Sequence, residues 1–277
     1  MIRVQQITYR YKQGTSGREV LKGIDFIIQQ GEWLTITGRN GSGKSTLIRM
    51  LNGLTLPHTG TIMIDGMNTE DRGNRDRIKQ KVQLVFQNPD AQIIGNTPME
   101  DVAFGLENRG IPKQEMHNRI ATALKQVRLD HKSHDLVATL SGGEKQRLAI
   151  ASSLALNPQY LIFDESTSML DPIGKKEIFS IAQSLSKKGI TIIWVTQELA
   201  EVVKSRRIAV FDQGVITYDG GPRELFYETD IPAKQRWDVP PMIEMGRLMK
   251  KQGIPVSSLP LCDQDLEELL CTFSFQL

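Results

Sequence analysis

The run 38–46, which reads GRNGSGKST, has the clearest chemical potential in the sequence. It fits the pattern of a phosphate-binding loop, G-x-x-x-x-G-K-[ST], and directly follows an apolar run. Gly38, Gly41 and Gly43 permit backbone conformations in which successive N–H groups converge on phosphate oxygens. Lys44 would reach the β- and γ-phosphates of a nucleotide, and the Ser45 hydroxyl would coordinate Mg²⁺. The other candidate contacts of this loop are Arg39, Asn40, Ser42 and Thr46.

The run YLIFDE at 160–165 supplies the acids that such a loop requires. An apolar strand delivers Asp164 and Glu165 at its C-terminal end, the edge at which parallel sheets bind ligands. We expect Asp164 to hold the metal, directly or through water, and Glu165 to take a proton from the attacking water. The two motifs together predict a nucleoside triphosphatase.

A second anion-binding turn is present in LSGGEKQR at 140–147, where a helix begins with exposed N–H groups. One phosphate loop already serves the chain's own nucleotide, so this second turn needs an explanation, the simplest being an ordinary capped helix. Here the sequence resembles the ATP-binding cassette family, whose signature is this string, over about residues 2–225. The resemblance implies a head-to-tail dimer in which Ser141, Gly142 and Gly143 close over the ATP of a partner.

Four further positions take their expected roles from this resemblance. Gln87 matches a glutamine that contacts Mg²⁺ and water and couples the site to a membrane partner. Asp171 matches an aspartate that crosses the dimer interface, and Tyr11 an aromatic residue that stacks on adenine. Gln197 departs from the family, most members of which have a histidine that contacts the γ-phosphate and helps to fix the water. Because glutamine cannot become charged or relay a proton, we expect slower hydrolysis than with histidine.

Short apolar runs must position these residues. They alternate with helix patterns that begin after 45, after Pro98, near Lys113, at Ser141, after Pro172 and after Thr196, so we predict an α/β fold with a largely parallel core sheet. The stretch 207–220 has a hairpin signal at its centre. The resemblance implies a P-loop NTPase cassette with a helical signature subdomain and an antiparallel N-terminal β region. The runs that suit strands covered on both faces are 33–38, 61–66, 82–87, 160–165 and 190–196.

We predict that the cassette occupies residues 1–225 and that 226–277 form a small, mostly helical extension with a dimerisation or regulatory role. Four apolar residues of this extension share one face of a predicted helix. This face packs on the main domain or on the second tail helix, or it contacts a partner. The residues are Met242, Met245, Leu248 and Met249.

Composition excludes several classes of protein. The 277 residues include 34 Lys and Arg against 32 Asp and Glu, and a net charge of +2 leaves no general basic surface for nucleic acid. No run approaches the roughly 18 apolar residues that span a bilayer. The N-terminus lacks the apolar core of a signal peptide, and Cys262 and Cys271 lie far from every motif. These features favour a reducing cytoplasm.

The run 86–110, FQNPDAQIIGNTPMEDVAFGLENRG, resembles the corresponding region of energy-coupling factor transporter A components, most closely the first of two paralogous A subunits. The resemblance implies an ATP- and Mg²⁺-dependent ATPase at the cytoplasmic face of the cell membrane that energises uptake of vitamins or other micronutrients. Its expected partners are a paralogous ATPase in a heterodimer, a transmembrane T component and, through the complex, a substrate-binding S component. We expect no direct contact with cargo or nucleic acid.

Two alternatives stay open. One is the ATPase of another importer of this family, for a metal ion or dependent on a soluble binding protein. The other is a soluble cassette ATPase that acts on nucleic acid or ribosomes.

Overall fold

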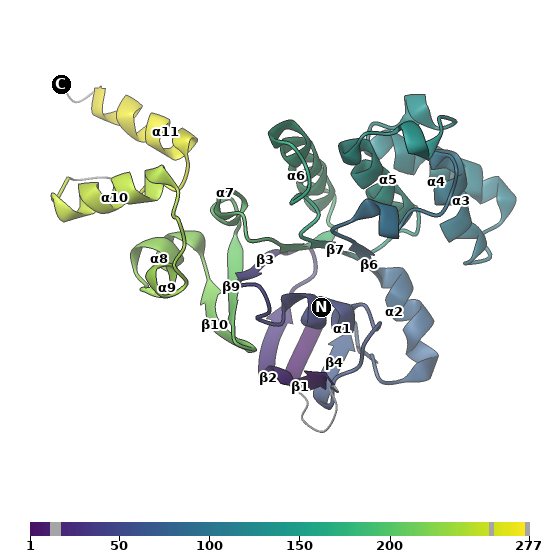
Figure 1. Cartoon of the computed structure of the whole chain (residues 1–277), viewed down its shortest axis with the longest axis horizontal. Helices are drawn as coiled ribbons and strands as arrows, with labels where there is room; N and C mark the ends of the chain where they lie inside the picture. Colours follow the sequence, from purple (N-terminus) through teal and green to yellow (C-terminus); the bar gives the residue numbers. More distant parts are fainter. Residues whose placement is uncertain (12–17, 255–257, 275–277) are drawn as a thin grey trace.

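The computed structural model describes residues 1–11, 18–254 and 258–274, and Figure 1 shows its elements. The larger sheet has the strand order β10-β9-β3-β8-β7-β6. β9, β3, β8, β7 and β6 run parallel, and β10 pairs antiparallel with β9, which confirms the predicted parallel core and hairpin. The strands are β3 (Trp33–Gly38), β6 (Val82–Val85), β7 (Tyr160–Asp164), β8 (Thr191–Val195), β9 (Arg207–Asp212) and β10 (Val215–Gly220).

A second, antiparallel sheet has the order β2-β1-β4-β5. The prediction that the run 61–66 is a strand covered on both faces, like those of the parallel core, is wrong, because β4 pairs with β1 and only Ile62 and Ile64 are fully buried. This alternation is typical of a strand with one covered face. Asp65 and Gly66, both with positive φ, form the two-residue turn that leads into β5. The strands are β1 (Ile2–Tyr11), β2 (Arg18–Ile28), β4 (Thr59–Ile64) and β5 (Met67–Asn68).

Helix α1 (Lys44–Leu51) lies in the core between the two sheets. Its residues Leu47, Ile48, Met50 and Leu51 are fully buried against side chains of both sheets. Because α1 begins directly after the loop that follows β3, this packing fixes the loop relative to both sheets.

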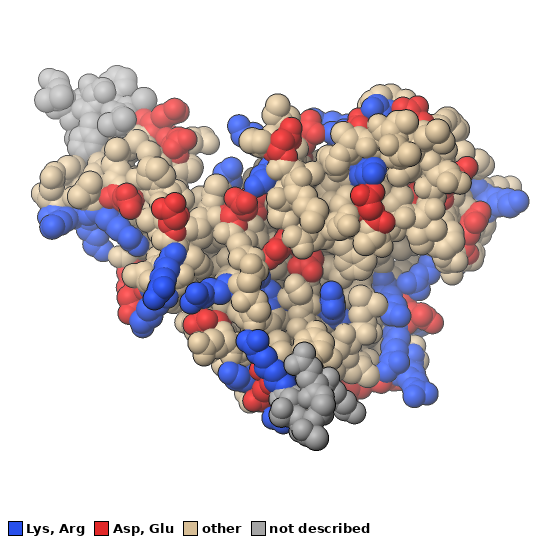
Figure 2. Space-filling view, in the orientation of Figure 1, with Lys and Arg blue, Asp and Glu red and all other residues tan. Residues whose placement is uncertain are grey.

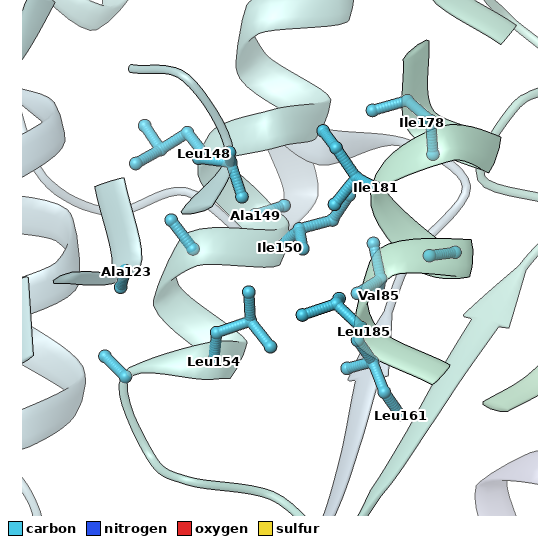
Figure 3. Packing of buried hydrophobic residues seen from close by; sticks show 14 of the residues in the cluster. Val85, Ala123, Leu148, Ala149, Ile150, Leu154, Leu161, Ile178, Ile181 and Leu185 are labelled. Atoms are coloured by element: carbon cyan, nitrogen blue, oxygen red, sulfur yellow. The ribbon is translucent and has the colours of Figure 1, made fainter. Parts of the chain in front are cut away.

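The helical subdomain consists of α3 (Pro98–Glu107), α4 (Lys113–Gln126) and α5 (Gly142–Leu154). Figure 3 shows how side chains of α5 and of α6 (Pro172–Lys187) point toward Val85 and Leu161 of the parallel sheet. The helices predicted to begin near 98, 113, 141, 172 and 196 are all present. The remaining short elements are α2 (Arg75–Lys81), α7 (Leu199–Val202) and 3₁₀ turns at Arg72–Asn74, Pro89–Ala91, Asp130–Lys132 and Val137–Thr139.

The C-terminal part contains α8 (Pro222–Tyr227), α9 (Ile231–Lys234), α10 (Pro241–Lys251) and α11 (Asp263–Ser274). Leu225 and Phe226 of α8 are fully buried in a cluster that includes both cassette and tail residues. α8 therefore crosses position 225, and the division of the chain at that point stays a prediction.

The methionine-rich face of α10 is only partly packed. The side of α10 that faces inward is formed by Ile243 and Gly246, whereas Met245 and Leu248 are 42% and 59% exposed. Intramolecular packing therefore does not account for Met245 and Leu248.

The surface matches the balanced composition. On the face shown in Figure 2, basic and acidic side chains are interspersed. Among the described residues, no helix combines the length and apolar character needed to cross a membrane. Cys262 is a free, half-buried cysteine.

Candidate nucleotide-binding site

The phosphate loop connects β3 to α1, and glycine is required at both of its ends. Gly38 has a φ of +131°, and a Cβ there would lie 2.0 Å from the Phe211 carbonyl oxygen. Gly43 has a φ of +108°, and its Cβ would lie 2.7 Å from a leucine side chain. The buried Lys44 amine donates hydrogen bonds to the carbonyl oxygens of Gly38 at 2.7 Å and Arg39 at 3.2 Å. The lysine side chain therefore folds back over the loop.

The two acids at the end of β7 lie against this loop. The Ser45 Oγ atom lies 3.4 Å from Asp164 Oδ1, and Lys44 Nζ lies 3.8 Å from Glu165 Oε1. Glu165 has a φ of +47°, an uncommon conformation for a residue other than glycine, and its N–H donates to the Val195 carbonyl at 3.0 Å. The structure thus brings together the two motifs that lie about 120 residues apart in the sequence.

Gln197 connects the acid to the loop. Its Nε2 atom donates to Glu165 Oε1 at 2.7 Å and to Asn40 Oδ1 at 2.7 Å. Gln197 therefore occupies a position from which an amide N–H reaches both the expected base and the phosphate loop.

Beside these residues lies an open cavity of about 480 Å³, which Lys44, Ser45 and Glu165 line and Asp164 and Gln197 do not. Tyr11, at the end of β1, lines one side and is 41% exposed, and its hydroxyl lies 3.2 Å from Thr46 Oγ1. Gln87 lines the cavity near the acids and donates from Nε2 to Ser168 Oγ at 3.1 Å. The cavity is also lined by Asn40, Gly41, Gly43, Lys44, Ser45 and Glu165.

Sequence reasoning missed Arg18 and Val20, which also line this cavity. Arg18 pairs with Tyr11 across β1 and β2. Recognition of these two segments as an antiparallel pair would have placed Arg18 beside the expected adenine contact.

The signature turn does not join this cavity. Ser141, Gly142 and Gly143 line a separate surface hollow together with Asp171, and the two cavities share no lining residue. The Ser141 hydroxyl accepts from the Glu144 N–H at 3.3 Å, and the Glu144 carboxylate accepts from the Ser141 N–H at 2.8 Å, which forms a capping box. The structure therefore places most of the predicted nucleotide contacts in two groups, whereas Arg39 and Ser42 line neither of these cavities.

Neither signature glycine is required by its own chain. A Cβ on Gly143 would meet no atom within 4 Å, and one on Gly142 would lie 3.9 Å from Leu170. Since alanine is the better helix former, contacts within this chain do not explain the glycines.

Burial affects the charged groups of the main cavity. It lowers the pKa of the Lys44 amine, an effect that Glu165 and Asp164 oppose, and it raises the pKa of the Asp164 carboxyl, to which the Glu165 carboxylate adds. A divalent cation beside Asp164 would offset this cost. The Ser45 hydroxyl, the Asp164 carboxylate and the Gln87 amide oxygen are donors that Mg²⁺ prefers, so these residues fit the metal.

The protein ligands are few, which is typical of magnesium sites completed by phosphates. Among the described residues, no group of three or more His, Cys, Asp and Glu side chains is arranged to hold a metal.

The chain is similar to known proteins over almost its full length. It is 41% identical to the energy-coupling factor transporter ATP-binding protein EcfA1 of Caldanaerobacter subterraneus subsp. tengcongensis, covering 98% of this chain and 99% of that protein. It is 39% identical to the EcfA1 protein of Bacillus subtilis, covering 100% and 98% respectively.

Solved structures are similar as well. CbiO1 of Clostridium perfringens, described as part of the ABC transporter complex cbiONQ, has a TM-score of 0.76 and 34% identity, covering 90% of this chain and 98% of that one. A dimeric ATP-binding cassette in a post-hydrolysis state with ADP and Pi has a TM-score of 0.72 and 29% identity, covering 80% and 99%. The ABC transporter family model matches residues 21–168. This chain therefore belongs to the ATP-hydrolysing ABC transporter family, within its group of energy-coupling factor transporter ATP-binding proteins.

Proposed function

We propose that this chain is the ATP-binding and ATP-hydrolysing subunit that energises an energy-coupling factor importer for vitamins or other micronutrients. The observation that carries the proposal is the separation of the phosphate loop and the signature turn into two cavities of one chain. A head-to-tail dimer completes each site, because it brings the signature turn of one subunit over the phosphate loop of the other. The paralogous ATPase of the group is the proposed second subunit.

In each site the chain holds the nucleotide from one side. Lys44 and the N–H groups of the loop bind the β- and γ-phosphates, and Tyr11 stacks on adenine. Ser45, Asp164 and Gln87 would hold Mg²⁺, which would neutralise phosphate charge. The partner supplies its Ser141, Gly142, Gly143 and Asp171 equivalents.

Hydrolysis depends on Glu165 and Gln197. Glu165 accepts a proton from the attacking water. The amide of Gln197 orients this carboxylate with one N–H, and the other N–H exchanges its bond to Asn40 for one to the γ-phosphate. Its lack of a titratable proton is the reason for the slow hydrolysis that we predict.

The arm that follows Gln87 is the proposed docking surface for the transmembrane T component. Ile94 and Leu136 are 67% and 59% exposed. Their loops are joined by a hydrogen bond from the Val137 N–H to the Asn96 carbonyl at 2.8 Å. Exposed apolar side chains on an ordered surface are typical of a contact site. Closure of the dimer on ATP would move this arm and the membrane helix bound to it.

We infer that the chain is a peripheral subunit at the cytoplasmic face of the membrane. The S component binds the substrate and meets this chain only through the complex. The chain itself therefore contacts neither cargo nor nucleic acid.

The proposal can be tested by identifying the proteins that co-purify with the chain and by measuring phosphate release from MgATP. Wild-type chain expressed in its native cell should be recovered with a second cassette and polytopic membrane proteins, and the complex should release phosphate from MgATP. Glu165→Gln should still bind ATP but release phosphate about 100-fold more slowly or worse. Ile94→Asp should lose the membrane proteins and retain ATP binding, whereas Lys113→Asp, at an exposed position at the start of α4, should behave as wild type.

Recovery with ribosomes or nucleic acid in place of membrane proteins would contradict the proposal. Recovery with membrane proteins and a soluble substrate-binding protein would support an importer of another type.

A further inference from the structure

Glu201 is a buried carboxylate that the chemistry above does not use. It lies on α7 and is 7% exposed. Its Oε1 atom accepts a hydrogen bond from Thr167 Oγ1 and its Oε2 atom one from Trp194 Nε1, both at 2.8 Å. Both donors are neutral. Burial of a carboxylate is costly even when it is hydrogen-bonded, so the placement of this acid calls for a reason.

The first contact holds the segment that carries the base. Thr167 follows Glu165 by two residues, and Ser166 and Thr167 are 2% and 1% exposed. The Thr167 carbonyl also accepts from the Leu170 N–H at 3.0 Å, which starts the turn toward Asp171. Since Glu165 has a positive φ, its conformation persists only if the surrounding chain holds it in place.

The second contact holds the segment that carries Gln197. Trp194 lies on β8, three residues before Gln197. The centroid of its ring lies 4.7 Å from that of the Phe163 ring on β7. Glu201 follows Gln197 by four residues, and its own N–H donates to the Glu198 carbonyl at 2.9 Å. The Glu201 carboxylate thus connects three segments: the strand before Gln197, the helix after Gln197 and the turn after Glu165.

We propose that Glu201 is a positioning residue for ATP hydrolysis, which holds the Glu165 carboxylate and the Gln197 amide in contact. Their 2.7 Å hydrogen bond depends on two separate backbone segments, and Glu201 is hydrogen-bonded to both. The inference rests on the proposed function, because it assigns Glu201 to the same reaction. It predicts an effect on the chemical step and not on nucleotide affinity.

The test compares three variants in the full chain with its co-purified subunits. Glu201→Ala removes both hydrogen bonds and should lower kcat by about 10- to 100-fold, with the Kd for MgATP changed less than about twofold. Glu201→Gln should retain most of the rate, because its amide oxygen accepts from the indole and its amide N–H donates to the Thr167 hydroxyl. Thr167→Val removes one bond with little change of shape and should give an intermediate rate, which keeps the test decisive if Glu201→Ala fails to fold.

Ser205→Ala is the matched control. Ser205 is also buried and is hydrogen-bonded to Thr35 and to the Glu201 carbonyl, but it has no hydrogen bond to Thr167 or Trp194. The kcat of Ser205→Ala should stay near that of wild type. The inference is overturned if Glu201→Ala has a normal kcat. It is also overturned if the kcat of Ser205→Ala falls as far as that of Glu201→Ala, or if Glu201→Gln is as slow as Glu201→Ala. A wild-type complex that releases no phosphate would instead refute the proposed function.

Discussion

At the scale of single residues, the main cavity is organised by pairs of side chains that lie far apart in the sequence. Lys44 lies near Glu165, Ser45 faces Asp164, and Gln197 contacts Glu165. A substitution at any of these positions therefore changes the surroundings of its partner as well.

Replacement of Gln197 by histidine tests the role of the amide. In Gln197→His we expect the single-turnover rate of MgATP hydrolysis to rise by roughly tenfold, because a positioned acid–base group contributes on the order of 10²- to 10⁴-fold. Gln197→Ala removes the hydrogen bonds to Glu165 and Asn40 and should fall below wild type. No rise in Gln197→His, at unchanged ATP affinity, would contradict the prediction.

At the scale of elements, the start of α5 combines a well-capped helix with glycines that its own chain does not need. The Glu144 carboxylate accepts from Lys132 and from the Ser141 N–H, and these bonds lower its pKa to about 2. The cap thus stays ionised and formed throughout the neutral range, and it presents the turn in one conformation.

The variant Gly143→Ala tests whether this glycine is needed for dimerisation and not for the stability of the fold. Because the added methyl group meets no atom of the chain, the free energy of unfolding of the nucleotide-free protein should stay the same or rise by up to about 1 kcal/mol. ATP-dependent dimerisation, measured by light scattering, and phosphate release should both fall. Gly105→Ala in α3, where a Cβ also meets nothing within 4 Å, should stabilise the protein without this loss. If Gly143→Ala dimerised normally, the result would contradict the hypothesis that the nucleotide of a partner subunit binds against this turn.

Asp65 connects the two sheets at the turn between β4 and β5. It accepts from Lys81 at the end of α2 and from Tyr160 at the start of β7. Burial raises the pKa of Asp65, but hydrogen bonds from Lys81, the Met1 amino group and Tyr160 outweigh it and lower the pKa to about 2. The ionised form therefore stabilises the fold.

Asp65→Asn should lower the free energy of unfolding by about 1.5–3 kcal/mol at neutral pH. Because the folded-state pKa lies below the ordinary value of about 3.9, the stabilisation is fully present above that value and is lost as the pH falls toward 2. Urea unfolding of both proteins should show a constant difference from pH 8 to 5 that shrinks below about pH 4. A difference independent of pH down to 3 would contradict the role of the ionised carboxylate.

At the scale of the whole molecule, the chain exposes apolar side chains in two separate regions. Met169 and Ile173, beside the signature turn, are 66% and 70% exposed, and Met245 and Leu248 are exposed on α10.

The exposed face of α10 is the proposed contact of the tail with the paralogous subunit. Met245→Asp combined with Leu248→Asp should weaken the heterodimer at least about tenfold in gel filtration or native mass spectrometry. Lys250→Asp, at an exposed position of the same helix, serves as control. These point variants are preferable to truncation after Gly221, which would remove the buried Leu225 and Phe226.

Much of the fold followed from local patterns. The glycine-rich loop, the strand that ends in two acids, the hairpin at 207–220 and the helix starts depend on neighbouring residues and on elementary backbone chemistry. The prediction for the run 61–66 is wrong because the residues of a short apolar strand do not indicate which sheet the strand joins. That choice depends on its pairing with β1, which lies more than 50 residues away.

The sequence by itself determined the prediction of a nucleoside triphosphatase, from the types and spacing of the residues at 38–46 and 160–165, and the resemblance carried by 140–147 added the family. Only the tertiary structure decided how these motifs combine. It brought Gln197 within 2.7 Å of Glu165, placed the signature turn in a separate cavity and buried Glu201 between the segments that carry Glu165 and Gln197. The physical reason is that spacing along the chain determines which residues share a turn or a face, whereas contacts between distant segments depend on how the sheets and helices pack.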